Sequence, residues 1–467
     1  MIAPTVLQAA PAILPPLDPD FLPAAKWNHA YRALVAGDPG SRPAMFALER
    51  PDGISRFETR VLAEDHPASH LNARHAERLI KSLLWQQGAH TVFVGGAPEL
   101  GRHLAEVYSP GGARAFDYHF MGEQVYRRPF AIRNVALDDM PPAYTYPVNL
   151  GRHTRGCRVG FDLGGSERKV AATLDGRTVY TGELPWKPYF QTDPNYHFSA
   201  IDEAIGRAAR YLPRVDAIGG AAAGIYVDNE VRVASLFRGV SEPDFERRVR
   251  RIFFDLKQRW GNVPFEVAND GDVAALAGSI ALGAGSVLGI SMGTSQAGGF
   301  VTPKGSITPW LNELAFSPVD YRRDGPQDEW SGDRGCGVSF FSQQGVARFA
   351  AAAGFDYPAE MSPADQTTAV QSALAEGDPR AERVYDTLGV CFGYALAHYA
   401  EFYEFRHVLV FGGVTAGPAG GRILESARAV LRAEYPELAD QARLHLPEES
   451  LKRHGQAIAA ATLPQMG

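Results

Sequence analysis

The chain has few of the residues that mark secreted, zinc-clustered or membrane proteins. Only three of its 467 residues are cysteines, Cys157, Cys336 and Cys391, and they lie far apart. They support neither a disulfide framework nor a four-ligand zinc cluster, which favours a reducing compartment. No apolar run is long enough to cross a bilayer, and the proline-rich N-terminus lacks the positive region of a signal peptide. We therefore expect a cytoplasmic protein without a membrane partner.

The chain also lacks an excess of positive charge. Its formal net charge is −7 and its pI is about 6.0, which argues against a broad nucleic-acid surface. The N-terminal region shows no helix-turn-helix signature. A nucleic-acid partner is therefore not expected. The length, in contrast, is too great for a single core and predicts two or three domains.

Residues 1–150 predict a separate small α/β domain of unknown role, preceded by an extended, proline-punctuated arm. A Pro51-Asp52-Gly53 turn joins two strand-like segments and predicts a hairpin. Apolar residues at helical spacing over 73–87 and a strand at 91–94 follow. The proline-rich segment 140–147 is the expected domain boundary.

Residues 159–171 predict a buried strand, a Gly164-Gly165-Ser166 turn and a returning strand. Paired glycines let the backbone approach a ligand, and the amides of such a turn can bind an anion. Asp162, at the end of the strand, would hold a hydrated magnesium ion, which prefers carboxylate oxygens. The alternative is an ordinary hairpin with a glycine turn.

Asn269 and Asp270 lie where a strand meets a helix. Asp270 could simply cap the helix. A carboxylate at a crevice can also take the proton of a hydroxyl that attacks a phosphoryl group. Asn269 offers a donor and an acceptor that could orient a polyol.

Two later segments repeat the strand-and-glycine design. In the first, residues 286–301, two strands flank the turn Gly293-Thr294-Ser295. In the second, residues 407–414, a strand ends in Gly412-Gly413 before a helix. A phosphate chain held between two such loops is a recurring arrangement in nucleotide-dependent kinases.

These four segments, in this order, resemble the actin, sugar kinase and heat-shock chaperone superfamily, and within it the glucokinase-like ROK family. The resemblance covers about residues 158–467. It implies an α/β fold with two actin-like ATPase (ribonuclease H-like) lobes, here with the additional N-terminal α/β domain. The first lobe would span 151–270, joined by the C-terminal helix at 450–467, and the second 271–449.

The resemblance also implies roles for single residues. Asp270 would be the general base, and Asn269 and Glu313 would bind the sugar. The remaining implied residues bind nucleotide and phosphate: Gly164, Gly165, Ser166, Gly293, Thr294, Ser295, Gly412 and Gly413. ATP and Mg would serve as cofactors.

The sequence departs from the family on the sugar side. The family's histidine is replaced by Phe316, and its second sugar-binding glutamate aligns with Val338. The cysteine-rich zinc element is reduced to Cys336, so no zinc site is expected. Asp328, Glu329 or Asp333 could replace the missing carboxylate. Otherwise a modified sugar would place an apolar group against Phe316.

The function expected from this pattern is ATP- and Mg-dependent phosphorylation of a sugar or sugar-like hydroxyl. The alternative is a non-catalytic regulator that binds a sugar or nucleotide on the same scaffold, and a DNA-binding repressor is disfavoured by the charge. The sequence names neither the sugar nor the phosphoryl donor (ATP or polyphosphate). The oligomeric state stays open, with a homodimer as one possibility.

Overall fold

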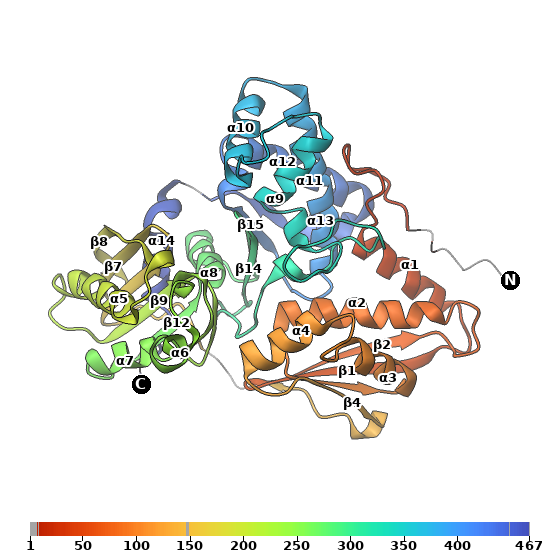
Figure 1. The fold of residues 1–467 in the computed structure, drawn as a ribbon, viewed down its shortest axis with the longest axis horizontal. Helices are drawn as coiled ribbons and strands as arrows, with labels where there is room; N and C mark the ends of the chain where they lie inside the picture. Colours follow the sequence, from red (N-terminus) through yellow and green to blue (C-terminus); the bar gives the residue numbers. More distant parts are fainter. Residues whose placement is uncertain (1–6, 8, 146–148, 448, 467) are drawn as a thin grey trace.

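The computed structural model describes residues 7, 9–145, 149–447 and 449–466, without the side chains of 449–452. The first residues of the expected arm and residues 146–148 of the expected boundary lie outside the described residues. The described part contains three larger sheets, one in the N-terminal domain, one in the first lobe (lobe one) and one in the second lobe (lobe two) (Figure 1). No helix of this part is both long and apolar enough to span a membrane.

The N-terminal domain is built on a five-stranded sheet with the order β4-β3-β1-β2-β5. Its strands are β1 (Arg42–Arg50), β2 (Gly53–Val61), β3 (Thr91–Gly95), β4 (Ala131–Val135) and β5 (Tyr144–Thr145). Its helices are α1 (Ala24–Ala36), α2 (His70–Gln87), α3 (Pro98–Val107) and α4 (Ala115–His119), followed by the π-helix η1 (Phe120–Tyr126) and the 3-10 turn η2 (Leu137–Asp139). In Figure 1, α2 and α4 lie between this sheet and the cyan and blue lobe above it.

Lobe one contains a sheet with the order β12-β9-β6-β7-β8. Its strands are β6 (Cys157–Leu163), β7 (Glu167–Leu174), β8 (Arg177–Pro185), β9 (Ala217–Ala222) and β12 (Phe265–Asn269), and a separate hairpin is formed by β10 (Ile225–Val227) and β11 (Glu230–Val233). Its helices and turns are η3 (Pro188–Phe190), α5 (Pro194–Ala209), η4 (Ser235–Phe237), α6 (Glu242–Asp244), η5 (Phe245–Val249) and α7 (Ile252–Arg259). A π-helical turn, η5, thus precedes the α-helix α7.

Lobe two contains a sheet with the order β14-β13-β15-β16. Its strands are β13 (Val287–Met292), β14 (Gln296–Val301), β15 (His407–Phe411) and β16 (Arg443–His445). Its helices and turns are α8 (Asp270–Leu282), η6 (Leu314–Phe316), η7 (Gly337–Ser339), α9 (Gln343–Ala352), α10 (Pro363–Ala375), α11 (Pro379–Tyr399), η8 (Gly413–Thr415), α12 (Pro418–Glu434) and α13 (Pro436–Gln441).

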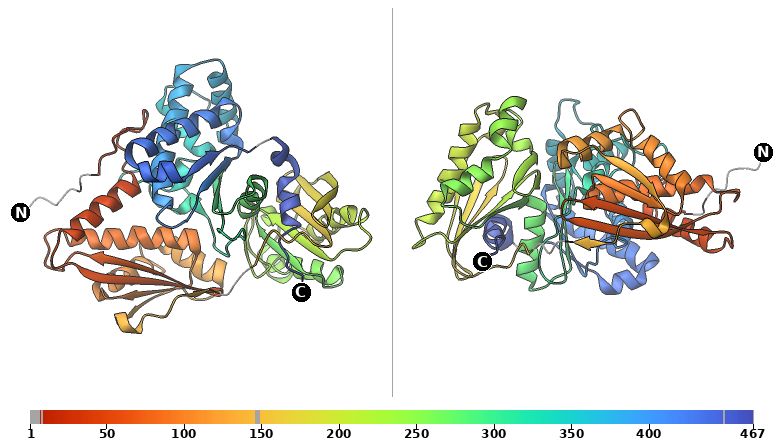
Figure 2. Two further views of the ribbon diagram at one scale, coloured as in Figure 1. Left: turned by 180° about the vertical axis from the view of Figure 1, so that it is seen from behind. Right: turned by 90° about the horizontal axis from the view of Figure 1, so that it is seen from below.

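The two lobes share one plan. Each begins with an antiparallel hairpin, β6–β7 or β13–β14, and adds parallel strands on the other side of the first strand. The all-buried β6 is typical of a central strand covered on both faces. The last helix, α14 (Glu449–Ala460), returns to lobe one (Figure 2). It packs so closely that a Cβ at Gly160 would lie 1.8 Å from the Ala457 carbonyl oxygen.

Three strand ends of lobe one meet at one edge of its sheet. Leu163 of β6 and Asn269 of β12 both pair with Ala222 of β9, in parallel register. Neighbouring strands lie about 4.8 Å apart, so the end of β6 and the end of β12 are about 10 Å apart. This edge therefore places Asp162 near the Asn269-Asp270 pair.

The N-terminal arm crosses lobe two. The backbone N–H groups of Ala12, Ile13 and Leu17 donate to Glu434, the Tyr394 hydroxyl and Thr387 at 2.6, 3.1 and 3.0 Å. Phe21 then enters the lobe-two core, 5.3 Å from the Phe340 ring. The arm and α1 thus tie the N-terminal domain to lobe two.

Candidate functional site

The start of α8 gives the Asn269-Asp270 pair its geometry. The helix N-cap is Asn269, not Asp270: its Oδ1 accepts from Gly271 N at 2.7 Å, and its Nδ2 donates to the Gly224 carbonyl at 2.8 Å. Asp270 is the first helical residue and accepts only from the adjacent Gly271 N at 3.0 Å. The interpretation of Asp270 as the cap is therefore wrong, and its carboxyl group is left for another role.

Three carboxyl groups influence one another at this edge. Burial raises the pKa of Asp270. Burial, and then the charge of Asp270, raise the pKa of Asp162 to about 7 and that of Glu313 to about 8. Three carboxylates that are partly shielded from water in this way are typical of a functional site, although structural networks also show such shifts.

One cavity, of about 390 Å³, lies between the lobes and is called the inter-lobe cavity here. Asp162 and Lys169 line it from lobe one, Gly412 and Thr415 from lobe two, and Arg453 from α14. Gly412 has φ +102°, and a Cβ there would lie 2.4 Å from the Met292 carbonyl oxygen. The end of β15 is therefore pressed against the end of β13, just before Gly293.

The other predicted phosphate residues lie in turns beside this cavity and do not line it. In the first turn, Gly164 N donates to the Glu167 carbonyl, and Trp186 Nε1 donates to the Gly164 carbonyl at 2.7 Å. Gly165 and Ser166 complete that turn. In the second turn, Gly293 N donates to the Ser295 carbonyl, with Thr294 and Ser295 exposed. Gly413 follows Gly412 and begins the 3-10 turn η8.

A second cavity, of about 420 Å³, lies where the three sheets meet and is called the junction cavity here. Lobe one contributes the segments 224–229 and 266–269, and lobe two contributes Asp272 and the segment 307–311. The N-terminal domain contributes Pro51, Asp52 and Tyr126. Of the residues predicted to bind sugar, Asn269 lines this cavity, whereas Glu313 lies behind it.

Glu313 is held from behind by the N-terminal domain. The backbone N–H groups of Asn312 and Glu313 donate to the carbonyls of Gln86 and Trp85, each at 2.9 Å. These carbonyls belong to the last turn of α2, where no intrahelical donor remains. Asn312 in turn donates to Asp272 at 2.8 Å and accepts from the Tyr403 hydroxyl at 2.9 Å. The additional domain is therefore part of the support of the site.

Phe316 and Val338 do not face a sugar pocket, contrary to the expectation from their alignment. Both are buried in the core of the N-terminal domain. The Phe316 ring lies 4.3 Å from that of Trp85 and 5.9 Å from that of Phe116. The apolar side chains at these two positions are explained by the docking of this domain, which needs an apolar surface there.

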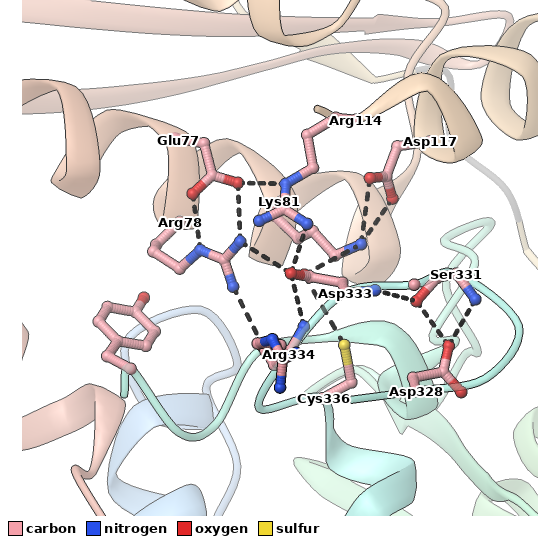
Figure 3. Close-up of polar contacts among 12 residues, drawn as sticks. Glu77, Arg78, Lys81, Arg114, Asp117, Asp328, Ser331, Asp333, Arg334 and Cys336 are labelled. Carbon is pink, nitrogen blue, oxygen red and sulfur yellow. Dashed lines mark hydrogen bonds and ion pairs between the residues drawn. The ribbon is translucent and has the colours of Figure 1, made fainter. Parts of the chain in front are cut away.

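The loop before Cys336 is also occupied by this docking (Figure 3). Asp333 pairs with Arg78 at 3.2 Å, with Lys81 at 3.4 Å and with Arg114, and Lys81 pairs with Asp117 at 2.8 Å. Burial alone would raise the pKa of Asp333, but Arg78 and Lys81 outweigh it and hold the pKa below its usual value.

The acidic residues of that loop therefore do not replace the missing sugar carboxylate. Asp333 is used by the ion pairs, and Asp328 accepts from Ser331 N and Oγ at 2.7 and 2.5 Å. Glu329 is exposed. None of the three lines the junction cavity. The Cys336 thiol is buried 3.8 Å from Asp333.

Sequence reasoning missed several residues of the two cavities. Lys169 is three residues beyond the first glycine turn, but a lone lysine in a strand gave no signal. Tyr226 lies in β10, Asp228 follows that strand, and Glu266 lies in β12, without a recognisable spacing. Asp52 lies in the Pro-Asp-Gly turn, which predicted a hairpin but not a ligand.

Comparison with solved structures places this geometry in a known class. A ROK hexokinase from Thermus thermophilus has a TM-score of 0.52 and 23% sequence identity, and the match covers 66% of this chain and 97% of that chain. A ROK family transcriptional regulator, a homolog of the E. coli MLC protein, has a TM-score of 0.51 and 19% identity over 70% of this chain and 81% of that chain. No protein-family model and no curated protein matches the sequence.

The fold is therefore an α/β fold with two lobes and an additional N-terminal α/β part. It matches the ROK family sugar kinases in particular, which confirms the fold class predicted from the glycine turns and the Asn-Asp pair. The ROK fold occurs among the solved structures both in a kinase and in a transcriptional regulator. The fold alone does not separate these activities.

Proposed function

We propose that this protein is a kinase that transfers a phosphoryl group from ATP to a hydroxyl of a sugar or sugar-like substrate, with Asp270 as the general base. The observation that carries the proposal is the place of Asp270. Asp270 lines neither cavity itself, but it follows Asn269 of the junction cavity and lies at the sheet edge that also holds Asp162 of the inter-lobe cavity, and it is not the helix cap. A base between a phosphate site and a hydroxyl site is what phosphoryl transfer needs.

The inter-lobe cavity suits a nucleotide. Lys169 and Arg453 bring positive charge to it, Gly412 lines it, and the turns at 164–166 and 293–295 lie beside it. The N–H groups of Gly164 and Gly293 already donate to carbonyls within their turns, but the hydroxyls of Ser166, Thr294 and Ser295 can donate to phosphate oxygens. Apolar residues, including Leu409 and Phe411, supply the surface that a purine ring requires.

Asp162 fits a magnesium ion that arrives with the nucleotide. Among the described residues, no group of three His, Cys, Asp or Glu side chains could hold a metal alone. A single carboxylate suffices for magnesium, which takes its other ligands from water and substrate phosphates. When bound, the ion would neutralise phosphate charge. The amide of Gln456, turned toward Asp162, donates to its two oxygens at 3.1 and 3.3 Å and orients the carboxylate.

In this scheme Asn269 and Glu313 would orient the acceptor. Asn269 keeps one donor and one acceptor position after its two structural hydrogen bonds. Asp270 would accept the proton of the attacking hydroxyl, and its raised pKa makes it a stronger base than an ordinary aspartate. Closure of the lobes would exclude water from the transfer.

The experiment is a panel of sugars and polyols incubated with ATP and magnesium, with ADP release as the readout and polyphosphate as a second donor. Release that depends on one acceptor supports the proposal. A regulator on the same fold is the second candidate, because a ROK transcriptional regulator is among the similar structures. Binding of a sugar without any ADP release would favour that candidate.

A further inference from the structure

The junction cavity has a wall that the two lobes do not supply. Pro51 and Asp52 from the β1–β2 turn and Tyr126 from the end of η1 face the same space as Asn269. The N-terminal domain also reaches lobe one beside the cavity, where Arg127 pairs with Glu246 at 2.6 Å. The added domain therefore closes a space that would otherwise open to solvent.

Asp52 is a fixed carboxylate on this wall. Arg50, whose side chain is fully buried, donates to it twice, from Nε to Oδ1 at 3.1 Å and from Nη2 to Oδ2 at 3.3 Å. Arg50 also donates to Ser55 Oγ at 3.0 Å. The pair holds the Asp52 carboxylate in one orientation, while 19% of that side chain remains exposed to the cavity. Each carboxylate oxygen has lone pairs left for a second donor.

Tyr126 presents a hydroxyl beside this carboxylate. The residue is buried, and its hydroxyl lies so near Gly88 that a Cβ there would be 1.9 Å away. Its pKa is raised by burial, and no hydrogen bond supports either form among the described residues. On the lining of the junction cavity, the Tyr126 hydroxyl can therefore both donate to and accept from a ligand hydroxyl.

The charge of the cavity restricts what it can hold. Its lining includes four acidic residues, Asp52, Asp228, Glu266 and Asp272, and the described residues on that lining include no lysine, arginine or histidine. Burial raises the pKa values of Glu266 and Asp272, which favours their neutral forms, so these groups can both donate and accept. An anionic ligand would meet repulsion here and no counter-charge.

We infer that Asp52 and Tyr126 are specificity-determining residues, which bind a hydroxyl or amino group of the phosphoryl acceptor. The inference rests on the proposed function and adds the substrate class. The acceptor is a neutral or amino-substituted polyol, and sugar phosphates and sugar acids are rejected. The additional domain is thus a part of the substrate site.

The test measures acceptor binding directly and then turnover. Calorimetry with glucose, mannose, glucosamine and myo-inositol, against glucuronate and glucose 6-phosphate, identifies a ligand of the native protein without nucleotide. Asp52→Asn, which keeps an acceptor for Arg50, is expected to weaken that binding about tenfold or more, and Tyr126→Phe severalfold. The KM for the acceptor should rise accordingly, while kcat and the KM for ATP stay within about twofold.

The matched control is Asp138→Asn, the same chemical change at an exposed position of the same domain, which should change neither value. Unchanged acceptor binding in both cavity variants would overturn the inference, as would a native protein that binds none of the neutral compounds or prefers the anionic ones. Binding that is weakened in the variants, in a protein that never releases ADP, would support the inference and refute the kinase proposal. Melting curves show whether a variant is unfolded. If Asp52→Asn is unfolded, the acceptor affinity of Tyr126→Phe decides the test.

Discussion

The two cavities differ in what builds them. The inter-lobe cavity is lined by the two lobes and α14, and two of the predicted site residues, Asp162 and Gly412, are on its lining. The junction cavity needs a third wall from the N-terminal domain, and its lining holds only one predicted residue, Asn269. The inter-lobe cavity thus depends on the two lobes, whereas the junction cavity also depends on the N-terminal domain.

The cavities also differ in charge. Lys169 and Arg453 line the inter-lobe cavity together with Asp162, whereas the charged residues of the junction cavity are all acidic. A nucleotide and an uncharged or amino-bearing acceptor would each be drawn to the matching side. If the proposed function holds, the phosphate side is supplied by the two lobes alone, and the acceptor side depends on the added domain.

The largest expected effect concerns Asp270, the proposed general base. Asp270→Asn should lower the rate of phosphoryl transfer by ~10²–10⁴-fold, because the general base is lost. Nucleotide affinity and the melting temperature should change little, since the helix cap is Asn269. Single-turnover kinetics and nucleotide titration measure both. A variant that keeps most of its turnover would show that Asp270 is not the base.

The second prediction uses the N-terminal domain, which lines the junction cavity but not the inter-lobe cavity. Asp333→Ala removes the carboxylate that Arg78, Lys81 and Arg114 share in a buried cluster. Loss of one partner of a buried ion pair costs ~3–5 kcal/mol, measured by urea unfolding. At a urea concentration that leaves the lobes folded, acceptor binding should weaken more than nucleotide binding.

The control for that variant is Arg127→Ala, which breaks the partly exposed pair with Glu246 on the other side of the domain. Such pairs contribute ~0–1 kcal/mol, so its stability should stay near that of the native protein. Equal destabilisation by both variants would contradict the view that the domain is anchored mainly through Asp333.

Short local patterns were enough to indicate the two-lobed fold, through their resemblance to a known family. A buried strand, a glycine turn and a strand-to-helix junction are each encoded within about ten residues. The docking of the N-terminal domain could not be predicted, because it depends on residues far apart in the chain. Phe316 contacts Trp85 and Asp333 contacts Lys81 across more than 200 residues.

The same dependence on distant residues explains why the surroundings of some side chains were predicted wrongly. Aligned with a family that lacks the domain, Phe316 and Val338 seemed to face a sugar, and the acids of the loop before Cys336 seemed free to replace a lost ligand. Each of these side chains except Glu329 is instead buried, against the N-terminal domain or within its own loop. An apolar residue at a position where the family has a polar one can therefore indicate contact with an additional domain as readily as a different substrate.

The third prediction tests the inter-lobe cavity alone. Gly412→Ala places a Cβ 2.4 Å from the Met292 carbonyl at a φ of +102°, which an alanine adopts only with strain. Such strain costs ~1–3 kcal/mol, and the turn should shift away from β13. We expect the KM for ATP to rise about tenfold, with acceptor binding unchanged. Gly421→Ala, in α12 with nothing near its Cβ, is the matched control.

The smallest effect concerns Glu313, which lies behind the junction cavity. Burial and the charge of Asp270 raise its pKa to about 8 from an ordinary value of 4.5. A raised carboxyl pKa means that the folded state binds the proton more tightly than the unfolded state. The stability from this proton is therefore complete below pH 4.5 and is lost as the pH rises through about 8.

Between pH 7 and 9 this loss amounts to about 1 kcal/mol, reduced further because Glu313 is only partly buried. The free energy of unfolding of the native protein should fall over that interval, and Glu313→Gln should remove the part of the fall that this residue causes. Urea unfolding at the two pH values measures the difference. If both proteins lose the same stability, Glu313 ionises freely, and the hydrogen bonds from α2 do not hold it in a water-poor position next to Asp270.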